Sequence, residues 1–502
     1  MTLGRNLIAG LANSVWSALI GLAVVPFYLK YLGIEAYGLI GLFITTQALL
    51  QLLDMGMAPT INREVARCSA AGDLNEAGKL LHTLAIVYWG MAALIAVLIL
   101  ALAPLIAEYW LQSRQLSPET VSHAVMLMGL VVACRWPIGL YQGALIGAQR
   151  LTISSAINMT MVTIGSVGAI AVLAFFSPTI EAFFTWQACV GFGYAIAIRM
   201  AAWRIVGGKS QYKFDLGVLK RVWRFTAGMS GIGLTALVFT QLDKVILSKM
   251  LELGEFGHYM LATVVVSGLY VLISPLFNVI YPRFSALVVT GDTEKLVELY
   301  RLGTRMLAMV LFPVAMALAL FAEDLVHVWT GDPVIAASVA PVISMLVVGS
   351  ALNGMMYFPY ALQLAYGMAW IPLTINVVLM CFLVPTIIYL AREYGAQGGA
   401  TAWMIAEVMY VLLGPWLTHR YILQGLAPKW LLQDVCVPLL LSVLIGVAGH
   451  RAILSGGFSH FERVMCAAGL ALFTATLTLL MSRQLRNIFW GCARRKKFAI
   501  KM

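Results

Sequence analysis

The sequence predicts an all-α polytopic membrane protein of about fourteen spans, built as two six-helix lobes followed by two further helices. Composition is the first observation. Of the 502 residues, 61% are hydrophobic and only 11% are charged, and the mean hydropathy is +0.89. A soluble chain carries about 25% charged residues. Apolar runs near 20 residues, long enough to cross a bilayer, recur along the whole chain, which places it in a membrane.

A repeated set of landmarks is the second observation, and it predicts a duplicated unit of about six helices. Gly38 and Gly257 each end a run of Leu-Gly, an acid and an aromatic-Gly pair, and they are 219 positions apart. Two more pairs share this offset to within one residue: Arg63 with Arg283, and Trp110 with Trp329. Six is an even number, so we expect a pseudo-two-fold axis along the membrane normal. Chance similarity between apolar helices is the alternative.

The spans follow from the apolar runs. They are placed at roughly 7–29, 37–53, 82–106, 121–148, 152–176, 180–200, 226–249, 256–280, 304–326, 337–363, 370–391, 396–418, 434–454 and 462–482. The first run is too long for a cleavable signal peptide. The expected domains are an N-lobe at 1–205, a basic linker at 206–221, a C-lobe at 222–420, and two added helices with a basic tail at 421–502.

Lys and Arg are concentrated in every second connection between spans, on one side of the membrane. Of 33 such residues, 25 fall on the side that holds the linker and the tail, and six fall on the other side. Arg135 and Lys244 remain inside the membrane. The positive-inside rule therefore places both termini in the cytoplasm. The net charge of +11 reflects this topology and does not indicate nucleic-acid binding.

The sequence motifs of several kinds of metal site and enzyme are missing or incomplete. The seven Cys include no C-x-x-C pair, so we expect neither a disulfide framework nor a metal site. Gly208-Lys209-Ser210 resembles the end of a phosphate-binding loop, but position 203 is Trp where that loop needs Gly. No H-E-x-x-H or G-x-S-x-G run occurs. We therefore expect no enzyme activity and no cofactor.

Two runs carry a family resemblance. The run YLGIEAYGL and the following LLDMGMAPTINREVAR contain Leu32-Gly33, Tyr37-Gly38, Asp54-x-Gly56 and Arg63, and the second half adds Asp243, Ile246-Leu247 and Gly257. This pattern resembles the polysaccharide transporter family, which includes the O-antigen repeat-unit flippases. That family belongs to the multidrug/oligosaccharidyl-lipid/polysaccharide exporter superfamily. The resemblance covers the first twelve helices, and two extra helices at the end are similar to the peptidoglycan-precursor flippases.

The resemblance implies a flippase that moves an undecaprenyl-diphosphate-linked oligosaccharide across a bacterial cytoplasmic membrane by alternating access, for polysaccharides such as the O-antigen of lipopolysaccharide. Its implied partners are that lipid, membrane lipids, a coupling H⁺ or Na⁺ and other polysaccharide-assembly proteins. Three alternatives stay open: a peptidoglycan-precursor flippase, a drug/cation antiporter of the same fold, and a membrane glycan polymerase or ligase. The polymerase is disfavoured because every outer connection is short.

Three basic residues are candidates for substrate binding. Arg135 lies mid-span beside Pro137, where an unpaired charge must face protein or water. Its planar guanidinium can donate two parallel hydrogen bonds to a diphosphate. It can equally donate to a carboxylate or to the backbone carbonyls that the proline leaves without a donor. Lys244, which can snorkel outward, and Arg63, at the inner end of the second span, are the other two candidates.

Three acids are candidates for coupling or gating. Asp243 in the seventh span and Glu407 in the twelfth are the candidate ion-coupling acids, since a buried acid can carry a proton. A structural role is the alternative for Glu407. Adjacent helical residues point about 100° apart, so we expect Asp243 not to pair with Lys244. Asp54, near Arg63, is the candidate inner-gate residue, with a plain surface turn as the alternative.

Overall fold

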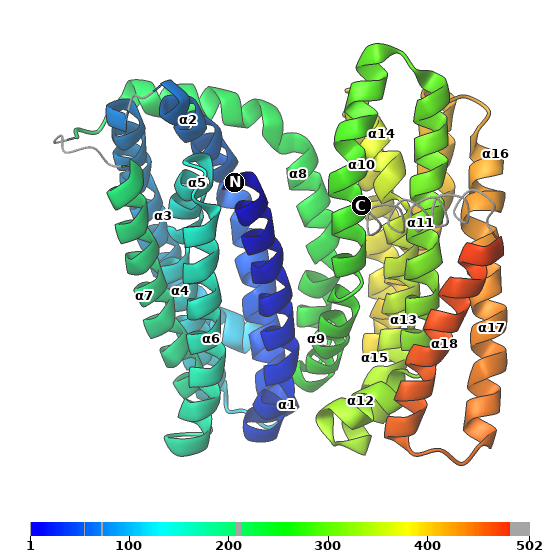
Figure 1. Ribbon diagram of the computed structural model, residues 1–502. Helices are drawn as coiled ribbons and strands as arrows, with labels where there is room; N and C mark the ends of the chain where they lie inside the picture. Colours follow the sequence, from blue (N-terminus) through cyan, green and yellow to red (C-terminus); the bar gives the residue numbers. More distant parts are fainter. Residues whose placement is uncertain (1, 55, 72–73, 207–211, 482–502) are drawn as a thin grey trace, which may run out of the picture. The chain divides into compact units, whose positions relative to one another are not determined.

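The computed structural model describes residues 2–54, 56–71, 74–206 and 212–481, and these are helical almost throughout (Figure 1). Eleven helical stretches of this part are long and apolar enough to cross a membrane. Two of the eleven each join two predicted spans at a bend, one at Gly33 and one at Gly395. The predicted all-α membrane fold is confirmed. The basic tail after Met481 and linker residues 207–211 lie outside the described residues.

Contacts divide the chain into two compact units, residues 1–257 and 258–502. These units group residues by packing, whereas the predicted lobes group them by repetition. The lobe boundaries and the axis between the lobes therefore stay predictions.

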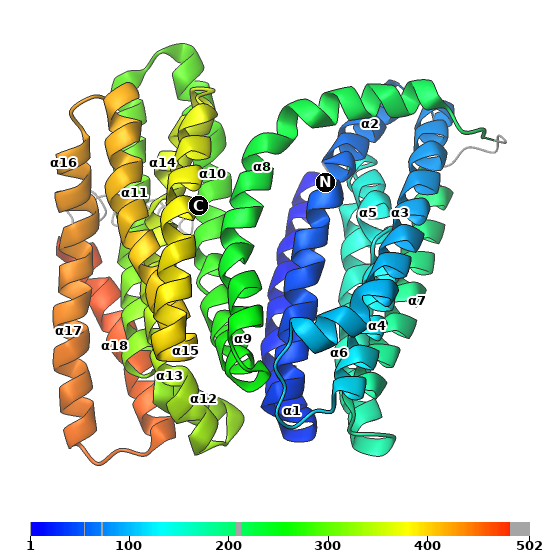
Figure 2. The same cartoon turned by 180° about the vertical axis from the view of Figure 1, so that it is seen from behind.

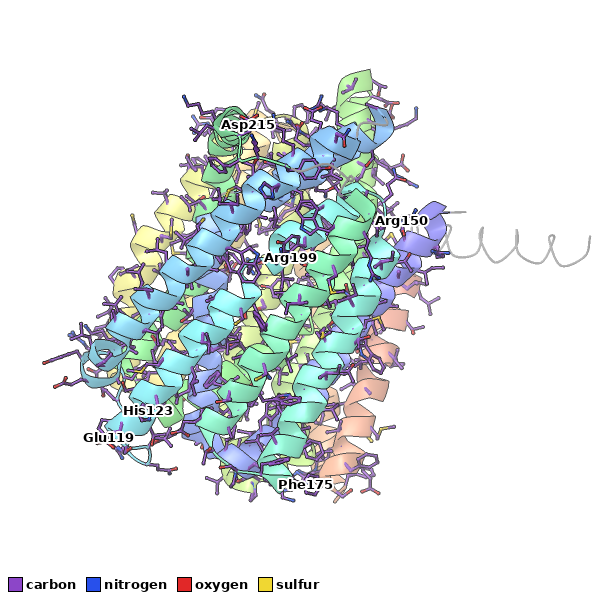
Figure 3. All side chains as sticks on the ribbon, turned by 90° about the vertical axis from the view of Figure 1, so that its left-hand side faces the viewer. Glu119, His123, Arg150, Phe175, Arg199 and Asp215 are labelled. Atoms are coloured by element: carbon purple, nitrogen blue, oxygen red, sulfur yellow. The ribbon has the colours of Figure 1, made fainter. Side chains whose placement is uncertain are left out.

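Unit 1 is a bundle in which α3 packs on α4, α4 on α7, α1 on α6, and α2 on α5. Its elements are α1 (Thr2–Leu50), a 3-10 turn (Gln51–Asp54), α2 (Met57–Ala71), α3 (Leu74–Tyr109), α4 (Pro118–Arg135), α5 (Ile138–Gly147), α6 (Leu151–Phe175), α7 (Ile180–Val206), α8 (Leu216–Met250) and the start of α9 (Leu253–Ser267). Seen from behind, α8 passes over α2 and α3 and then descends beside α1 (Figure 2). Arg150 and Asp215 lie at one end of this unit, and Glu119 and Phe175 lie at the other (Figure 3).

Unit 2 is built around α11, α13 and α15. After the rest of α9, its elements are α10 (Tyr270–Thr290), α11 (Thr293–Leu320), α12 (Ala322–Thr330), α13 (Pro333–Met355), α14 (Tyr357–Ala365), α15 (Trp370–Tyr421), α16 (Ala427–Lys429), a π-helical turn (Trp430–Cys436), α17 (Val437–Ser455) and α18 (His460–Met481). Gly395 has φ 56°, a left-handed value that glycine adopts at low cost, and there α15 bends into two limbs.

Helix boundaries in the two units recur at the offset found in the sequence. α3 begins at Leu74 and α11 begins 219 positions later, at Thr293. The break between α4 and α5 follows Arg135, and the break between α13 and α14 follows Met355, 220 positions later. Because a helix break is a backbone property, these matches support the duplication independently of side-chain similarity.

The last two helices are fixed to α11 and α12 by ion pairs at both ends. Asp434, just before α17, is fully buried and accepts from Arg301 at 2.7 Å and from Arg305 at 2.5 Å. Asp324 of α12 pairs with His460 of α18 at 2.6 Å and with Arg463 at 3.4 Å. The added helices are therefore an integral part of unit 2.

Candidate functional site

Arg135 lies in the packed interior of unit 1. It is the last residue of α4, because Pro137 has no N–H and cannot continue the helical ladder. Its Nη2 donates to Oε1 of Gln187 on α7 at 2.6 Å. Its guanidinium lies 5.4 Å from the ring centre of Phe43 on α1. The side chain is thus oriented by one amide and one aromatic face.

The charge of Arg135 is not neutralised by an acid. No carboxylate among the described residues lies within ion-pair distance of its guanidinium, and among these residues Gln187 is its hydrogen-bond acceptor. Arg135 packs closely against Gly191, where a Cβ would lie only 3.2 Å from Cγ of Arg135. A guanidinium has five donors, and an uncompensated charge at membrane depth is costly. The arrangement can therefore accept an anion.

A chain of polar side chains continues from this point through unit 1. Gln187 and Tyr194 are seven residues apart on α7 and so lie on one face. The Tyr194 hydroxyl receives from Gln142 of α5 at 2.6 Å and donates to Asn158 of α6 at 2.9 Å. Asn158 donates in turn to Asn13 of α1 at 2.7 Å. Uncharged hydrogen-bonding groups thus extend from the region of Arg135 across four helices.

Glu407 is the buried acid of unit 2. It lies in the second limb of α15 and is fully buried. The amide of Asn353, near the end of α13, donates to its two carboxyl oxygens at 3.1 and 3.0 Å. Tyr357 and Tyr410 lie close enough to interact with it electrostatically. The acid is therefore held where α13 breaks and α14 begins.

The prediction that Asp243 and Lys244 do not pair is wrong. Nζ of Lys244 lies 3.1 and 3.2 Å from the two carboxyl oxygens of Asp243 and also donates to the carbonyl of Thr240 at 2.8 Å. The Cβ directions do diverge, but the four-carbon stem of lysine is long enough to reach back along the helix. The two residues form a buried pair in unit 1, which neutralises both charges locally.

Asp54 and Arg63 are not brought together. Asp54 accepts from the hydroxyl of Tyr88 on α3 and from the backbone N–H of Ala58 at 3.2 Å, so it caps α2. Arg63 pairs with Glu64 at 2.6 Å, and its side chain is 54% exposed. Partial burial opposes ionisation of Glu64, but hydrogen bonds from Arg63 and Arg67 outweigh it and lower the pKa of Glu64. The roles predicted for Asp54 and Arg63 stay predictions.

Sequence analysis missed Gln187, the orienting partner of Arg135, because an amide in a span carries no distinctive signal. It also missed Glu35, whose carboxylate accepts from the backbone N–H groups of Arg114 at 3.0 Å, Gln115 at 2.9 Å and Leu116 at 3.2 Å. Glu35 is the acid of the first landmark run, so its recurrence as an acid at the second landmark was an available signal.

Comparison with known proteins identifies the family. A sequence model described as "Polysaccharide biosynthesis protein" matches residues 30–339, more than half of the chain. The chain is 21% identical over 419 residues to a Shigella flexneri protein described as "Putative O-antigen transporter", a match that covers 81% of this chain and 97% of that one.

Solved structures share the fold. "Lipid II flippase MurJ, inward closed conformation" matches with a TM-score of 0.68 and 12% identity over 94% of this chain and 98% of that one. An inward-facing multidrug resistance MATE family transporter of the MOP superfamily matches with a TM-score of 0.64 and 16% identity over 82% of this chain and 96% of that one. All three relatives are described as transporters or flippases. The resemblance drawn from the sequence is confirmed, and the chain belongs to the polysaccharide biosynthesis protein family.

Proposed function

We propose that this multi-pass membrane protein is a flippase for an undecaprenyl-diphosphate-linked oligosaccharide in the bacterial cytoplasmic membrane. It exposes the headgroup to one side at a time while both termini stay in the cytoplasm. Family membership and the description of the Shigella flexneri relative support the substrate class. The charge bias of the connections supports the orientation.

Arg135 is the observation that carries the proposal. A lipid diphosphate brings fixed negative charge into a membrane protein, and a fork of parallel N–H groups binds it with charge-assisted hydrogen bonds. Arg135 is half-buried, oriented by Gln187 and without a carboxylate within ion-pair distance among the described residues. A buried guanidinium that served structure alone would more economically be neutralised by an acid.

Glu407 is the better of the two proposed coupling acids. Asp243 already has a cation beside it, so its charge is balanced in place by Lys244. Glu407 is contacted by a neutral amide that can hydrogen-bond the acid in either protonation state. Gain or loss of a proton at Glu407 therefore changes the net charge of unit 2, which coupling to an H⁺ gradient requires.

Proteoliposomes test the proposal directly. Wild-type protein is expected to move the headgroup of undecaprenyl-diphosphate-N-acetylglucosamine across the bilayer, and Arg135→Gln is expected to reduce the rate roughly 10- to 100-fold through loss of charged hydrogen bonds. Arg135→Lys keeps the charge and loses the fork, so its rate should be intermediate. Arg392→Gln, at an exposed site on α15, is the matched control. Wild-type transport by Arg135→Gln would exclude the diphosphate role.

A peptidoglycan-precursor flippase is the second candidate, because the solved lipid II flippase aligns with 94% of this chain, including the region of the added helices. Lipid II in the same assay separates the two. Faster transport of lipid II than of an oligosaccharide-linked lipid would favour this second candidate.

A further inference from the structure

The exposed surface of α10 in unit 2 carries polar groups, although α10 is one of the segments able to cross a membrane. Ser274, Asn278 and Arg283 are exposed on α10, interleaved with two prolines and with apolar Val271 and Val279. The exposed face of α18 differs in kind, with the large apolar side chains Phe461, Met465, Leu472, Phe473 and Leu480. Contact with hydrocarbon is favourable for these side chains of α18 and costly for Asn278 and Arg283 of α10. The α10 face therefore meets water or a polar ligand.

Four rings beside this face form an aromatic patch, defined as Phe277 and Tyr281 of α10 with Tyr357 and Tyr360 of α14. Phe277 is at its centre. Its ring is stacked with Tyr281 at 5.6 Å and 9° and with Tyr360 at 6.4 Å and 18°. Tyr357 meets Phe277 edge-on at 5.7 Å. All four side chains are half-buried, so part of the patch is accessible.

The polar atoms of the patch have no partners within the described protein. The hydroxyls of Tyr281, Tyr357 and Tyr360, and the side-chain amide of Asn278, make no hydrogen bond to any described residue. The three tyrosine side chains are partly exposed, so their hydroxyls are open to solvent or to a ligand. These three hydroxyls and one amide are thus available to a ligand.

The prolines add backbone acceptors on the same face. Pro275 and Pro282 have no N–H, so the carbonyls four residues earlier, at Val271 and Asn278, lose their helical donors. Both of those residues are exposed. Donors, acceptors and aromatic surface therefore converge on one side of α10.

We infer that the aromatic patch binds the sugar part of the transported lipid, an inference that rests on the proposed flippase function. A pyranose ring has an apolar C–H face that packs on an aromatic ring and hydroxyls that both donate and accept. The patch offers both surfaces. Tyr357 of the patch adjoins Glu407, the acid that Asn353 contacts.

Binding to two lipid probes tests this assignment. The purified full-length protein in nanodiscs is titrated with undecaprenyl-diphosphate-N-acetylglucosamine and with sugar-free undecaprenyl diphosphate. Wild type is expected to bind the sugar-bearing lipid more tightly. The triple variant Tyr281→Phe, Tyr357→Phe, Tyr360→Phe keeps every ring and removes three hydroxyls, and should weaken the sugar-bearing lipid roughly tenfold or more while leaving the sugar-free lipid unchanged.

Tyr389→Phe, at a tyrosine of α15 that is 68% exposed, is the matched control and should change neither affinity. Asn278→Leu is a second, independent probe of the same face. Equal affinities of wild type for the two lipids, or an equal loss for both lipids in the triple variant, would overturn the sugar assignment and leave the flippase proposal standing. If wild type bound neither lipid, the flippase proposal and the sugar site would both fall.

Discussion

Gly38 and Gly257 pack against each other's helices in unit 1 through two equivalent contacts, which the 219-residue repeat relates to one another. A Cβ on Gly38 would lie 2.4 Å from the carbonyl oxygen of Leu253, and a Cβ on Gly257 would lie 2.4 Å from the carbonyl oxygen of Ile34. Leu253 and Gly257 each follow Ile34 and Gly38 by 219 positions. A local two-fold axis produces such reciprocity.

Gly38→Ala and Gly257→Ala should each destabilise the protein. The new methyl group meets backbone, which cannot move aside as a side chain can, and overpacking costs about 1–3 kcal/mol. The measurement is the Tm in detergent, with both variants falling by similar amounts. Gly254→Ala is the control, since its methyl group would make an ordinary contact at 3.6 Å. A loss confined to one of the two glycines would contradict the reciprocal contact.

Gln187→Glu should separate stability from transport. The new carboxylate would lie where Oε1 now accepts from Arg135 at 2.6 Å, forming a buried ion pair. Pairing should raise the Tm while it occupies the charge that we assign to the diphosphate. Transport in proteoliposomes is therefore expected to fall at least tenfold, consistent with loss of a charged hydrogen bond. Wild-type transport together with a raised Tm would show that the charge of Arg135 serves structure only.

Glu407→Gln should make headgroup transport insensitive to an imposed pH or Na⁺ gradient, because it keeps the shape of the side chain and removes its titratable proton. Asp243→Asn should leave the gradient response intact and lower the Tm, since it removes the carboxylate that Lys244 now contacts. Rates with and without each gradient provide the measurement. If both variants follow the gradients as wild type does, neither acid couples transport to the gradient.

Asp434→Asn should loosen the added helices. It removes the carboxylate shared by Arg301 and Arg305, and breaking a buried ion pair costs about 3–5 kcal/mol. Thermal unfolding and limited proteolysis after α16 both report the loss. Asp292→Asn is the control, because that carboxylate pairs with Lys295 at the exposed surface, where solvent screens the two charges. Equal effects of the two substitutions would refute the anchoring role.

Accessibility labelling of the two termini should place both on the cytoplasmic side. The expectation rests on an even number of spans and on the charge bias. Single cysteines added at each end of a cysteine-free chain, probed with an impermeant maleimide, provide the test. Labelling of only one end from outside would mean that a span had been missed or invented.

Properties that depend on local sequence were predictable. Apolar runs marked the spans because transfer into hydrocarbon depends on composition over about 20 residues. The position of Arg135 at a helix break followed from its place beside Pro137, and the 219-residue offset pointed to Gly38 and Gly257 before any contact was known.

Properties that depend on distant contacts or side-chain reach were not predictable. Asp434 and its arginines are about 130 residues apart, and nothing local links them. The Asp243–Lys244 pair does not follow from Cβ directions, because the lysine stem is long enough to reach back along the helix. The aromatic patch joins α10 to α14, and the aromatic residues of either helix alone give no sign that they meet.

Glu35 has a consequence for how this chain can vary. Its carboxylate holds the connection before α4 through three backbone N–H groups, which every residue except proline supplies. Side chains at positions 115 and 116 are therefore free to change so long as proline is avoided, whereas position 35 must keep a carboxylate that reaches all three donors. In a saturation library selected for folding, most substitutions at positions 115 and 116 would be accepted, whereas most substitutions of Glu35 would be rejected.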